Sequence, residues 1–161
     1  MLSNLGKTPR DSWVTMTELV LPHHTNQLGT VFGGTVMSWM DICGAIAAFR
    51  HVGGEVVTAS VDDLHFLAPI YLGWIVEITG HVCYAGNTSV DVWVEVNAEN
   101  PHTRERSRTA QSFLTFVARD VQGQPKKVPP LILETEQDHK LHELAKLRRS
   151  QRLQRKQMSQ I

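Results

Sequence analysis

The sequence predicts an α+β fold in which one long helix packs on a five-stranded antiparallel sheet. Three observations predict it. The segment 34–52 is apolar over too long a run for a typical strand, so it is assigned to a helix. Five other segments have strand character, and the last four are joined by short loops that force antiparallel pairing. The helix is apolar nearly all round, so either the sheet curls around it or a second copy of the chain covers the remainder.

The elements follow one another in a simple order. Residues 1–11 read as a loose arm, and the segment SWVTMTELVL forms a first strand over 12–21, ended by Pro22. The glycine-rich loop HHTNQLGTVFGG leads into the helix, which Gly53-Gly54 closes as a glycine C-terminus should. Further strands are expected over 55–67, 74–84, 88–97 and 108–119. The strand over 88–97 alternates valines with polar residues, which is typical of half-buried antiparallel sheet.

Charge is balanced overall but unevenly distributed. The 161 residues, enough for one domain, include sixteen basic and sixteen acidic residues. From Leu144 onward there are six basic residues and no acid. A helix is predicted over 134–158, with a thin apolar stripe formed by Leu141, Leu144 and Leu147, and it either docks on the body or a neighbour or ends in disorder. Nucleic-acid binding is not expected, because this tail has no aromatic or groove-reading residues among its charges. We expect an arm at 1–11, one domain at 12–130 and a charged C-terminal segment at 131–161.

The cysteines and the N-terminus favour a cytoplasmic protein. Cys43 and Cys83 lie in apolar segments without a CxxC pattern, so they are expected to be buried, reduced thiols. The N-terminus MLSNLGKTPR has no apolar core of a signal peptide. No run of about 18 apolar residues occurs, and no membrane partner is expected.

Asp41 is the residue that most needs an explanation. It lies inside the apolar helix segment MSWMDICGAIAAF, where a carboxylate is costly unless something pairs with it or uses it. Gly44, one turn further on, costs about 1 kcal/mol relative to alanine in a helix and is expected to leave room for a ligand beside the carboxylate. The alternative is an aspartate that pairs with an arginine or caps a loop.

Gly33-Gly34 lies at the expected start of the same helix. The first amide groups of a helix are unpaired and carry the positive end of its dipole, and glycine lets a ligand approach the backbone closely. Such a site can hold the oxygen of a carbonyl that becomes negative during acyl transfer. The alternative is a tight turn from loop to helix.

These residues resemble a known family. The segment LPHHTNQLGTVFGGTVMSWMDICGAIAAFRH resembles the acyl-CoA thioesterase branch of the hotdog-fold superfamily, with its Asn-x-x-Gly loop, Gly-Gly helix start and Met-Asp pair in the central helix. The later segments TASVDDLHFLAP, GNTSVDVWVEV and SFLTFVA are similar to strands of that branch. The resemblance covers about residues 13–130, and the order of elements agrees with that read from the pattern.

The resemblance implies a fold, an activity and an assembly. A curved five-stranded antiparallel sheet would wrap the central helix, and two copies would pair edge to edge, as part of a trimer of dimers, with sites at their interface. Asp41 would be the catalytic carboxylate, acting as general base or as nucleophile in the hydrolysis of acyl-CoA, a step of fatty acid metabolism. Asn26 would come from the other subunit, and Gly33 and Gly34 would hold the oxyanion. CoA is part of the substrate, and no metal or other cofactor is expected.

Residues for the CoA arm are less defined. Thr88 and Ser89 are similar to residues that flank this arm in relatives, although turn chemistry also explains them. Basic side chains bind the phosphates of CoA, and the candidates are Arg50, Arg108, Lys126 and Lys127. Each of these could equally be a solvated surface charge.

Several other readings compete with thioester hydrolysis. His23 and His24 suggest a metal, but no further ligands complete a set, so they are expected to structure their loop. Hotdog hydratases and dehydratases place a histidine where Phe32 stands here, which argues against that chemistry. A non-catalytic acyl-CoA sensor would not need Asn26 and Asp41. Trp39 and Phe49 are expected in the core, and the chain-length preference is not encoded in any recognisable pattern.

Overall fold

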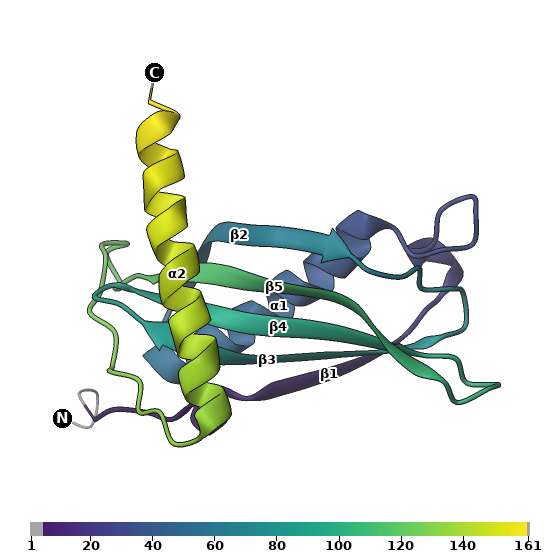
Figure 1. Cartoon of the computed structure of the whole chain (residues 1–161), viewed down its shortest axis with the longest axis horizontal. Helices are drawn as coiled ribbons and strands as arrows, with labels where there is room; N and C mark the ends of the chain where they lie inside the picture. The colour runs from purple at the N-terminus through teal and green to yellow at the C-terminus, as the bar shows by residue number, and fades with distance from the viewer. Residues whose placement is uncertain (1–4, 161) are drawn as a thin grey trace.

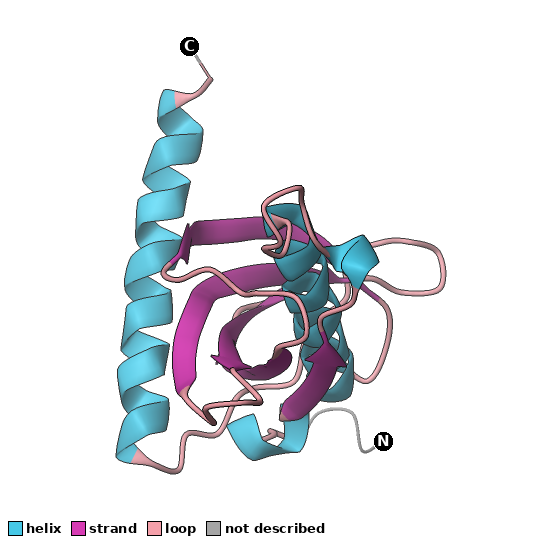
Figure 2. Cartoon of the chain, turned by 90° about the vertical axis from the view of Figure 1, so that its right-hand side faces the viewer, coloured by secondary structure: helices cyan, strands magenta, loops and turns pink. Residues whose placement is uncertain are grey.

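A curled antiparallel sheet surrounds one long helix in the computed structural model, which describes residues 5–160 (Figures 1 and 2). The elements, in chain order, are η1 (Pro9–Ser12), β1 (Val14–Leu19), η2 (Pro22–His24), α1 (Gly33–Val52), β2 (Val56–Phe66), β3 (Ile75–Ala85), β4 (Ser89–Glu99), β5 (Arg106–Ala118) and α2 (Glu136–Met158). The predicted α+β class is confirmed, and the predicted strands are found within two residues at each end. No described helix is both long and apolar enough to cross a bilayer.

The strand order leaves β1 and β2 as the two edge strands of the sheet. The sheet runs β1-β3-β4-β5-β2, with all neighbours antiparallel. The valines at 90, 92, 94 and 96 in β4, in the middle of the sheet, are fully buried, as their alternation predicts. β1 and β2 each pair on one side only, so β2 is an edge strand whose outer backbone groups have no partner within the described chain.

Helix α1 lies in the trough of the sheet with one side left open. Trp39, Met40 and Cys43 are buried against the strands, as an apolar helix inside a curled sheet requires. Gly53 ends the helix in the left-handed conformation, with φ 73°, which confirms the predicted stop. The prediction that Phe49 packs in the core is wrong. Phe49 lies on the side of α1 turned away from the sheet, and its side chain is 48% exposed.

Gly44 is explained by packing and not by space for a ligand. A Cβ built on Gly44 would lie 2.9 Å from the Phe116 ring on β5. The helix therefore approaches the sheet too closely for any side chain at this position. The expectation that Gly44 leaves room beside Asp41 is wrong, since the space is already filled by Phe116.

Helix α2 crosses the outer, convex face of the sheet (Figures 1 and 2). Thr135 and Asp138 form a capping box at its start, with Thr135 accepting a hydrogen bond from the Asp138 amide. The predicted stripe is right only for Leu141, which packs with Ala145 over Phe113, whereas Leu144 and Leu147 are exposed. The last turns of the helix project past β2 (Figure 1). Ion pairs hold most of its second half to the sheet, which is why its apolar stripe is thin.

Candidate active site

Asp41 is held by a hydroxyl from β2. Its side chain, half-buried on α1, accepts a hydrogen bond of 2.7 Å at Oδ1 from Thr58 Oγ1. Its second oxygen, Oδ2, accepts no hydrogen bond, and no Lys, Arg or His pairs with the carboxylate within residues 5–160. The alternative in which an arginine neutralises Asp41 is therefore wrong for the described chain. An ionised carboxylate with one oxygen fixed and one open can take a proton or attack a carbon.

A bulge in β2 brings Thr58 to this position. Thr58 pairs with Phe116 of β5, but Ser60 pairs with Thr115, so Ala59 is an extra residue without a partner of its own. The bulge reverses the alternation of side chains. Thr58 consequently lies on the inner face with Phe116 and α1, while Ser60 lies on the outer face with Thr115.

Thr58 is a site residue that the sequence analysis missed. In the segment VVTASVDD a threonine looks like any other strand residue, because nothing in a regular alternation predicts the bulge. The only available signal was the resemblance of the whole TASVDDLHFLAP segment, which does not single out one hydroxyl.

The start of α1 offers unpaired amides. Phe32 is the N-cap residue and gives no side-chain cap, and its carbonyl accepts from Thr35 and Val36. The N–H groups of Gly33 and Gly34 have no acceptor within the described chain. A Cβ on Gly33 would lie 3.1 Å from the Phe66 ring, so close packing is one reason for a glycine at this position. A Cβ on Gly34 would meet no atom within 4 Å. The amide of Gly34 is therefore the more open of the two.

An apolar cavity opens beside this helix start. It measures about 380 Å³, and its walls include Val36, Phe66, Leu67 and Ile70 next to Gly33. A chain of methylene groups fits walls of this kind, because apolar surface is removed from water on both sides.

Asn26 folds its own loop. Its Oδ1 accepts from the backbone N–H of Leu28 at 2.9 Å and of Thr30 at 3.2 Å, and its Nδ2 donates to Thr30 Oγ1 at 2.9 Å. No hydrogen bond joins Asn26 to Asp41 within one described chain. His24 also organises this region, since its Nδ1 accepts from the Leu21 N–H at 3.0 Å, which confirms the expected loop-structuring role.

The open side of α1 and the β2 edge carry a run of exposed apolar side chains on both sides of Asp41. Ile42 and Phe49 on α1 and Val61 on β2 are each more than a third exposed, and Val57, which precedes Thr58 and so lies on the outer face, is 46% exposed. Single exposed apolar residues are ordinary, but several beside a strand edge that has no partner in the described chain favour an interaction surface there.

The residues expected to hold CoA do not all come together. Lys127 and the turn before Thr88 line one cavity of about 500 Å³, and the Val128 N–H donates to the Asn87 carbonyl. Arg108 instead pairs with Glu95 at 3.1 Å on the outer face. These two positions belong to different regions of the surface.

The remaining candidates are engaged in other contacts. Arg50 donates to the Trp13 carbonyl, and Lys126 has its ammonium next to Gly54. Ser89 is buried and accepts a hydrogen bond from Arg149 of α2. The basic groups nearest Ser89 are thus arginines of α2, the helix for which the sequence left open docking on the body, docking on a neighbour and disorder at its end.

The fold and the site define a class of protein. One helix wrapped by a curled antiparallel sheet, with a carboxylate at an open edge, is the hotdog arrangement. Residues 28–105 match the model of the thioesterase superfamily. A Bacillus subtilis protein named as an uncharacterized acyl-CoA thioester hydrolase is 42% identical over 94% of this chain and 88% of its own length. The chain belongs to the hotdog-fold acyl-CoA thioesterase family, a family of thioester hydrolases.

Other relatives add detail. The mouse cytosolic acyl coenzyme A thioester hydrolase is 35% identical, and this chain spans 36% of its length. An acyl-CoA hydrolase of Staphylococcus aureus, solved with butyryl coenzyme A and coenzyme A, superposes with a TM-score of 0.89, at 36% identity over 96% of this chain and 94% of its own. A hexameric acyl-CoA thioesterase superposes with a TM-score of 0.90, at 40% identity over 94% of this chain and 97% of its own.

The Staphylococcus aureus protein has also been solved as three alanine variants. They replace an asparagine, an aspartate and a threonine, which have the same spacing along that chain as Asn26, Asp41 and Thr58 have here.

Proposed function

We propose that the protein hydrolyses acyl-CoA to a free carboxylic acid and CoA, with Asp41 as the reacting carboxylate. The observation that carries the proposal is the hydrogen bond from Thr58 to Asp41 Oδ1, which leaves Oδ2 without a partner in the described chain. A charged oxygen held in one orientation at an open edge is what a general base or a nucleophile needs. The relatives named as acyl-CoA hydrolases support the same substrate class.

Two routes use the same groups. As a general base, Asp41 takes a proton from water, whose oxygen bonds to the thioester carbon while the carbon–sulfur bond breaks. As a nucleophile, Asp41 bonds to the thioester carbon while the carbon–sulfur bond breaks and the CoA thiolate leaves, and water then cleaves the resulting mixed anhydride into the free acid and the aspartate. In both routes the amides of Gly33 and Gly34 face the oxygen that becomes negative. The leaving group is a thiolate, and since the reference pKa of a cysteine thiol is about 8.5, such a group needs no strong acid to leave, so neither route requires a metal or a further cofactor.

The site is completed by a second copy of the chain. The β2 edge has no partner strand within the described chain and lies beside exposed apolar side chains of α1, a surface that a second β2 edge would cover. Asn26 of the second copy would then orient the water or the thioester carbonyl. Pairing into a hexamer, as in the similar hexameric thioesterase, is part of this proposal. A monomer seen by light scattering at micromolar concentration would contradict it.

Two further assignments complete the proposal. The CoA arm would pass Thr88 and Ser89, with its phosphates held by basic groups drawn from Arg50, Arg108, Lys126 and Lys127. The location would be the cytoplasm, which the two buried free cysteines and the cytosolic mouse relative support. Hydrolysis that EDTA abolishes would contradict the metal-free mechanism.

The decisive experiment replaces Asp41. Asp41→Asn keeps the size of the side chain and can still accept from Thr58, but it cannot act as a base, so turnover of acyl-CoA should fall by roughly 10³-fold or more. Release of free thiol from acyl-CoA of several chain lengths measures the rate and the preference together. Wild-type turnover by Asp41→Asn would overturn the assignment, and loss of turnover with unchanged thermal unfolding would support it.

A second measurement tests for the nucleophilic route. In a single turnover carried out in ¹⁸O water, an anhydride that water opens at the aspartyl carbon would leave ¹⁸O on Asp41, which identifies this route. Direct attack of water on the thioester carbon, or opening of the anhydride at its acyl carbon, would put the label only into the product acid. Mass spectrometry of the peptide that contains Asp41 distinguishes the first outcome from the second.

A further inference from the structure

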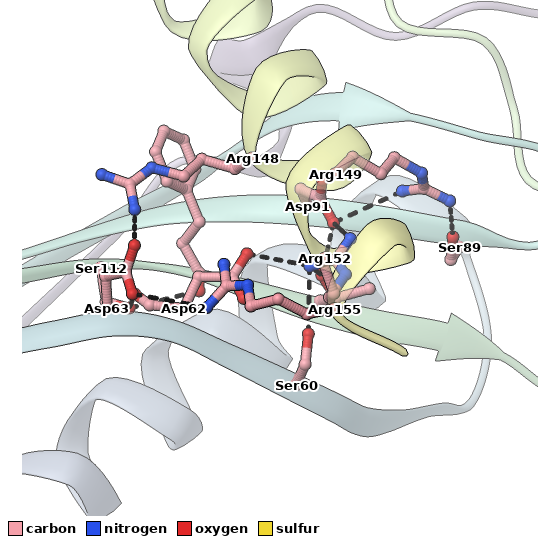
Figure 3. A network of polar contacts seen from close by, with 12 residues as sticks. Ser60, Asp62, Asp63, Ser89, Asp91, Ser112, Arg148, Arg149, Arg152 and Arg155 are labelled. Atoms are coloured by element: carbon pink, nitrogen blue, oxygen red, sulfur yellow. Dashed lines mark hydrogen bonds and ion pairs between the residues drawn. The ribbon is translucent and has the colours of Figure 1, made fainter. Parts of the chain in front are cut away.

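The β2 strand is held from both faces of the sheet by two different helices. On the inner face, Thr58 donates to Asp41 of α1 at 2.7 Å. On the outer face, Arg152 of α2 donates to Ser60 Oγ at 3.1 Å and to Asp62 Oδ2 at 3.0 Å (Figure 3). The bulge at Ala59 makes this double contact possible, because it turns Thr58 and Ser60 to opposite faces.

The outer contact is partly buried and is shared with the centre of the sheet. The same guanidinium nitrogen of Arg152 donates to Thr115 Oγ1 at 2.7 Å, and its partner nitrogen lies 3.7 Å from Asp91. Asp62, Asp91 and Thr115 are each less than a tenth exposed. Arg152 therefore links the edge strand β2 to its neighbour β5 and to β4, the next strand of the sheet, through one side chain.

The charges in this network depend on one another. Thr115 Oγ1 donates to Asp91 at 2.6 Å, and Arg149 approaches the same carboxylate at 3.5 Å (Figure 3). Burial raises the pKa of Asp91, and the Thr115 hydroxyl and the two arginines offset part of that rise. A buried carboxylate of this kind is stable only while its partners stay in place, so the geometry around Arg152 is tightly determined.

The edge strand needs this support near the bulge. β2 pairs only with β5, and its register shifts twice, between Thr58 and Ser60 and between Asp62 and His65. Asp63, at the second register shift, has φ 44° and forms ion pairs with Arg148 and Arg155 of α2. Both irregular points of β2 are thus fastened to α2 by arginines.

We propose that Arg152 is a positioning residue for the reaction, fixing the outer side of the β2 bulge so that Thr58 keeps its hydrogen bond to Asp41 on the inner side. This inference rests on the proposed function of Asp41. The basic residues of α2 would then serve catalysis by positioning β2. Binding of phosphates, or solvation of the helix, would not give them this role.

The first test replaces the guanidinium and keeps the stem. In Arg152→Met, the bulge loses its outer support, and kcat for acyl-CoA should fall roughly tenfold while KM changes less than about twofold, because a misplaced carboxylate affects the transition state more than substrate binding. Lys146→Met is the matched control, since Lys146 is an exposed cation on α2 whose one ion pair within residues 5–160 is with Glu143. It should retain wild-type kcat. A raised KM with unchanged kcat in Arg152→Met would make Arg152 a CoA-binding residue and overturn the inference.

A double-mutant cycle tests the route through Thr58. If Arg152 acts by placing the Thr58 hydroxyl, then Arg152→Met should cost little further kcat in a Thr58→Val background. Losses that multiply in the double variant would show an independent route and overturn the inference.

A milder variant covers the case in which Arg152→Met does not fold. Ser60→Ala removes one contact to the bulge and leaves every buried carboxylate paired, so it should keep the melting temperature and lower kcat roughly threefold. Wild-type kcat in Ser60→Ala and in a folded Arg152→Met, together with an inactive Asp41→Asn, would overturn this inference alone. An active Asp41→Asn would overturn the proposed function instead.

Discussion

Thr58 and Asp41 meet where β2 crosses α1, and the threonine hydroxyl donates to Oδ1 of the aspartate at 2.7 Å. The hydrogen bond fixes the rotation of the carboxyl group, because it holds Oδ1 next to the Thr58 hydroxyl. Oδ2 is left without a hydrogen-bond partner in the described chain. No Lys, Arg or His pairs with Asp41 within residues 5–160, so the Thr58 hydroxyl is the group that holds this carboxylate in the described chain.

Removal of the Thr58 hydroxyl should slow catalysis without unfolding the protein. Thr58→Val keeps the shape and the β-branched preference for a strand, but it cannot donate to Asp41. A hydrogen bond to a charged group contributes about 1.5–3 kcal/mol, which corresponds to a loss of about 10- to 100-fold in kcat. Thiol release measures the rate, and Thr58→Ser, which keeps the hydroxyl, should retain most of the activity. Equal losses in the two variants would show that the methyl group matters and the hydroxyl does not.

Local pattern was sufficient to predict the elements and part of the site. The helix α1 is a long apolar run closed by Gly53, and β4 alternates without interruption, so both could be predicted from their own residues. Asp41 stood out because a charge conflicts with an apolar helix. Gly33 and Gly34 stood out because they sit at the helix start.

The features that escaped prediction depend on contacts between distant segments. Thr58 reaches Asp41 only because of a bulge, and a bulge leaves no mark in the alternation of VVTASVDD. Gly44 looked like space beside the carboxylate, but Phe116, far along the chain, fills that space. The docking of α2 was left open because its apolar stripe is thin and its contacts to the sheet are mostly ionic, which hydrophobic periodicity does not detect.

The two glycines at the start of α1 should respond differently to alanine. A Cβ at Gly34 meets no atom within 4 Å, so Gly34→Ala should fold normally and gain up to about 1 kcal/mol in helix propensity. Its methyl group would occupy the open space in front of the amide, so turnover should fall at least about tenfold through the lost approach of the thioester oxygen. Gly33→Ala should lose both stability and turnover, because its Cβ would press on the Phe66 ring at 3.1 Å. Thermal unfolding and thiol release on both variants test this contrast, and full activity in Gly34→Ala would contradict it.

Gly44 gives a test of stability apart from catalysis. Gly44→Ala adds a Cβ 2.9 Å from the Phe116 ring, and overpacking of this kind costs about 1–3 kcal/mol, more than the roughly 1 kcal/mol that alanine gains in a helix. Urea unfolding should show a net loss. Phe116→Leu removes the ring atoms that collide, so the cost of Gly44→Ala should be smaller in that background. Equal costs in both backgrounds would mean that Phe116 is not the obstacle.

His51 should make the fold sensitive to acid. Its ring is fully buried at the end of α1, its Nε2 lies 2.8 Å from the Pro129 carbonyl, and its Nδ1 has no partner in the described chain. Since a carbonyl only accepts, Nε2 donates and Nδ1 is unprotonated. Burial lowers the pKa of His51 below its ordinary value of 6.5, and the bond to Pro129 offsets only part of that decrease.

The sign of the pH effect follows from this lowered pKa. Below about pH 6.5 the unfolded chain binds a proton at this histidine while the folded chain does not, so the free energy of unfolding falls as the pH is lowered, by at most about 1.4 kcal/mol per pH unit from this group. His51→Gln can still donate to the Pro129 carbonyl but cannot titrate. It should therefore lose less stability than the wild type between pH 7.5 and 5.5, as measured by urea unfolding at each pH, whereas exposed His102→Gln should lose as much as the wild type. The same loss in all three proteins would mean that other groups, such as buried His81, whose pKa burial also lowers, account for the acid sensitivity.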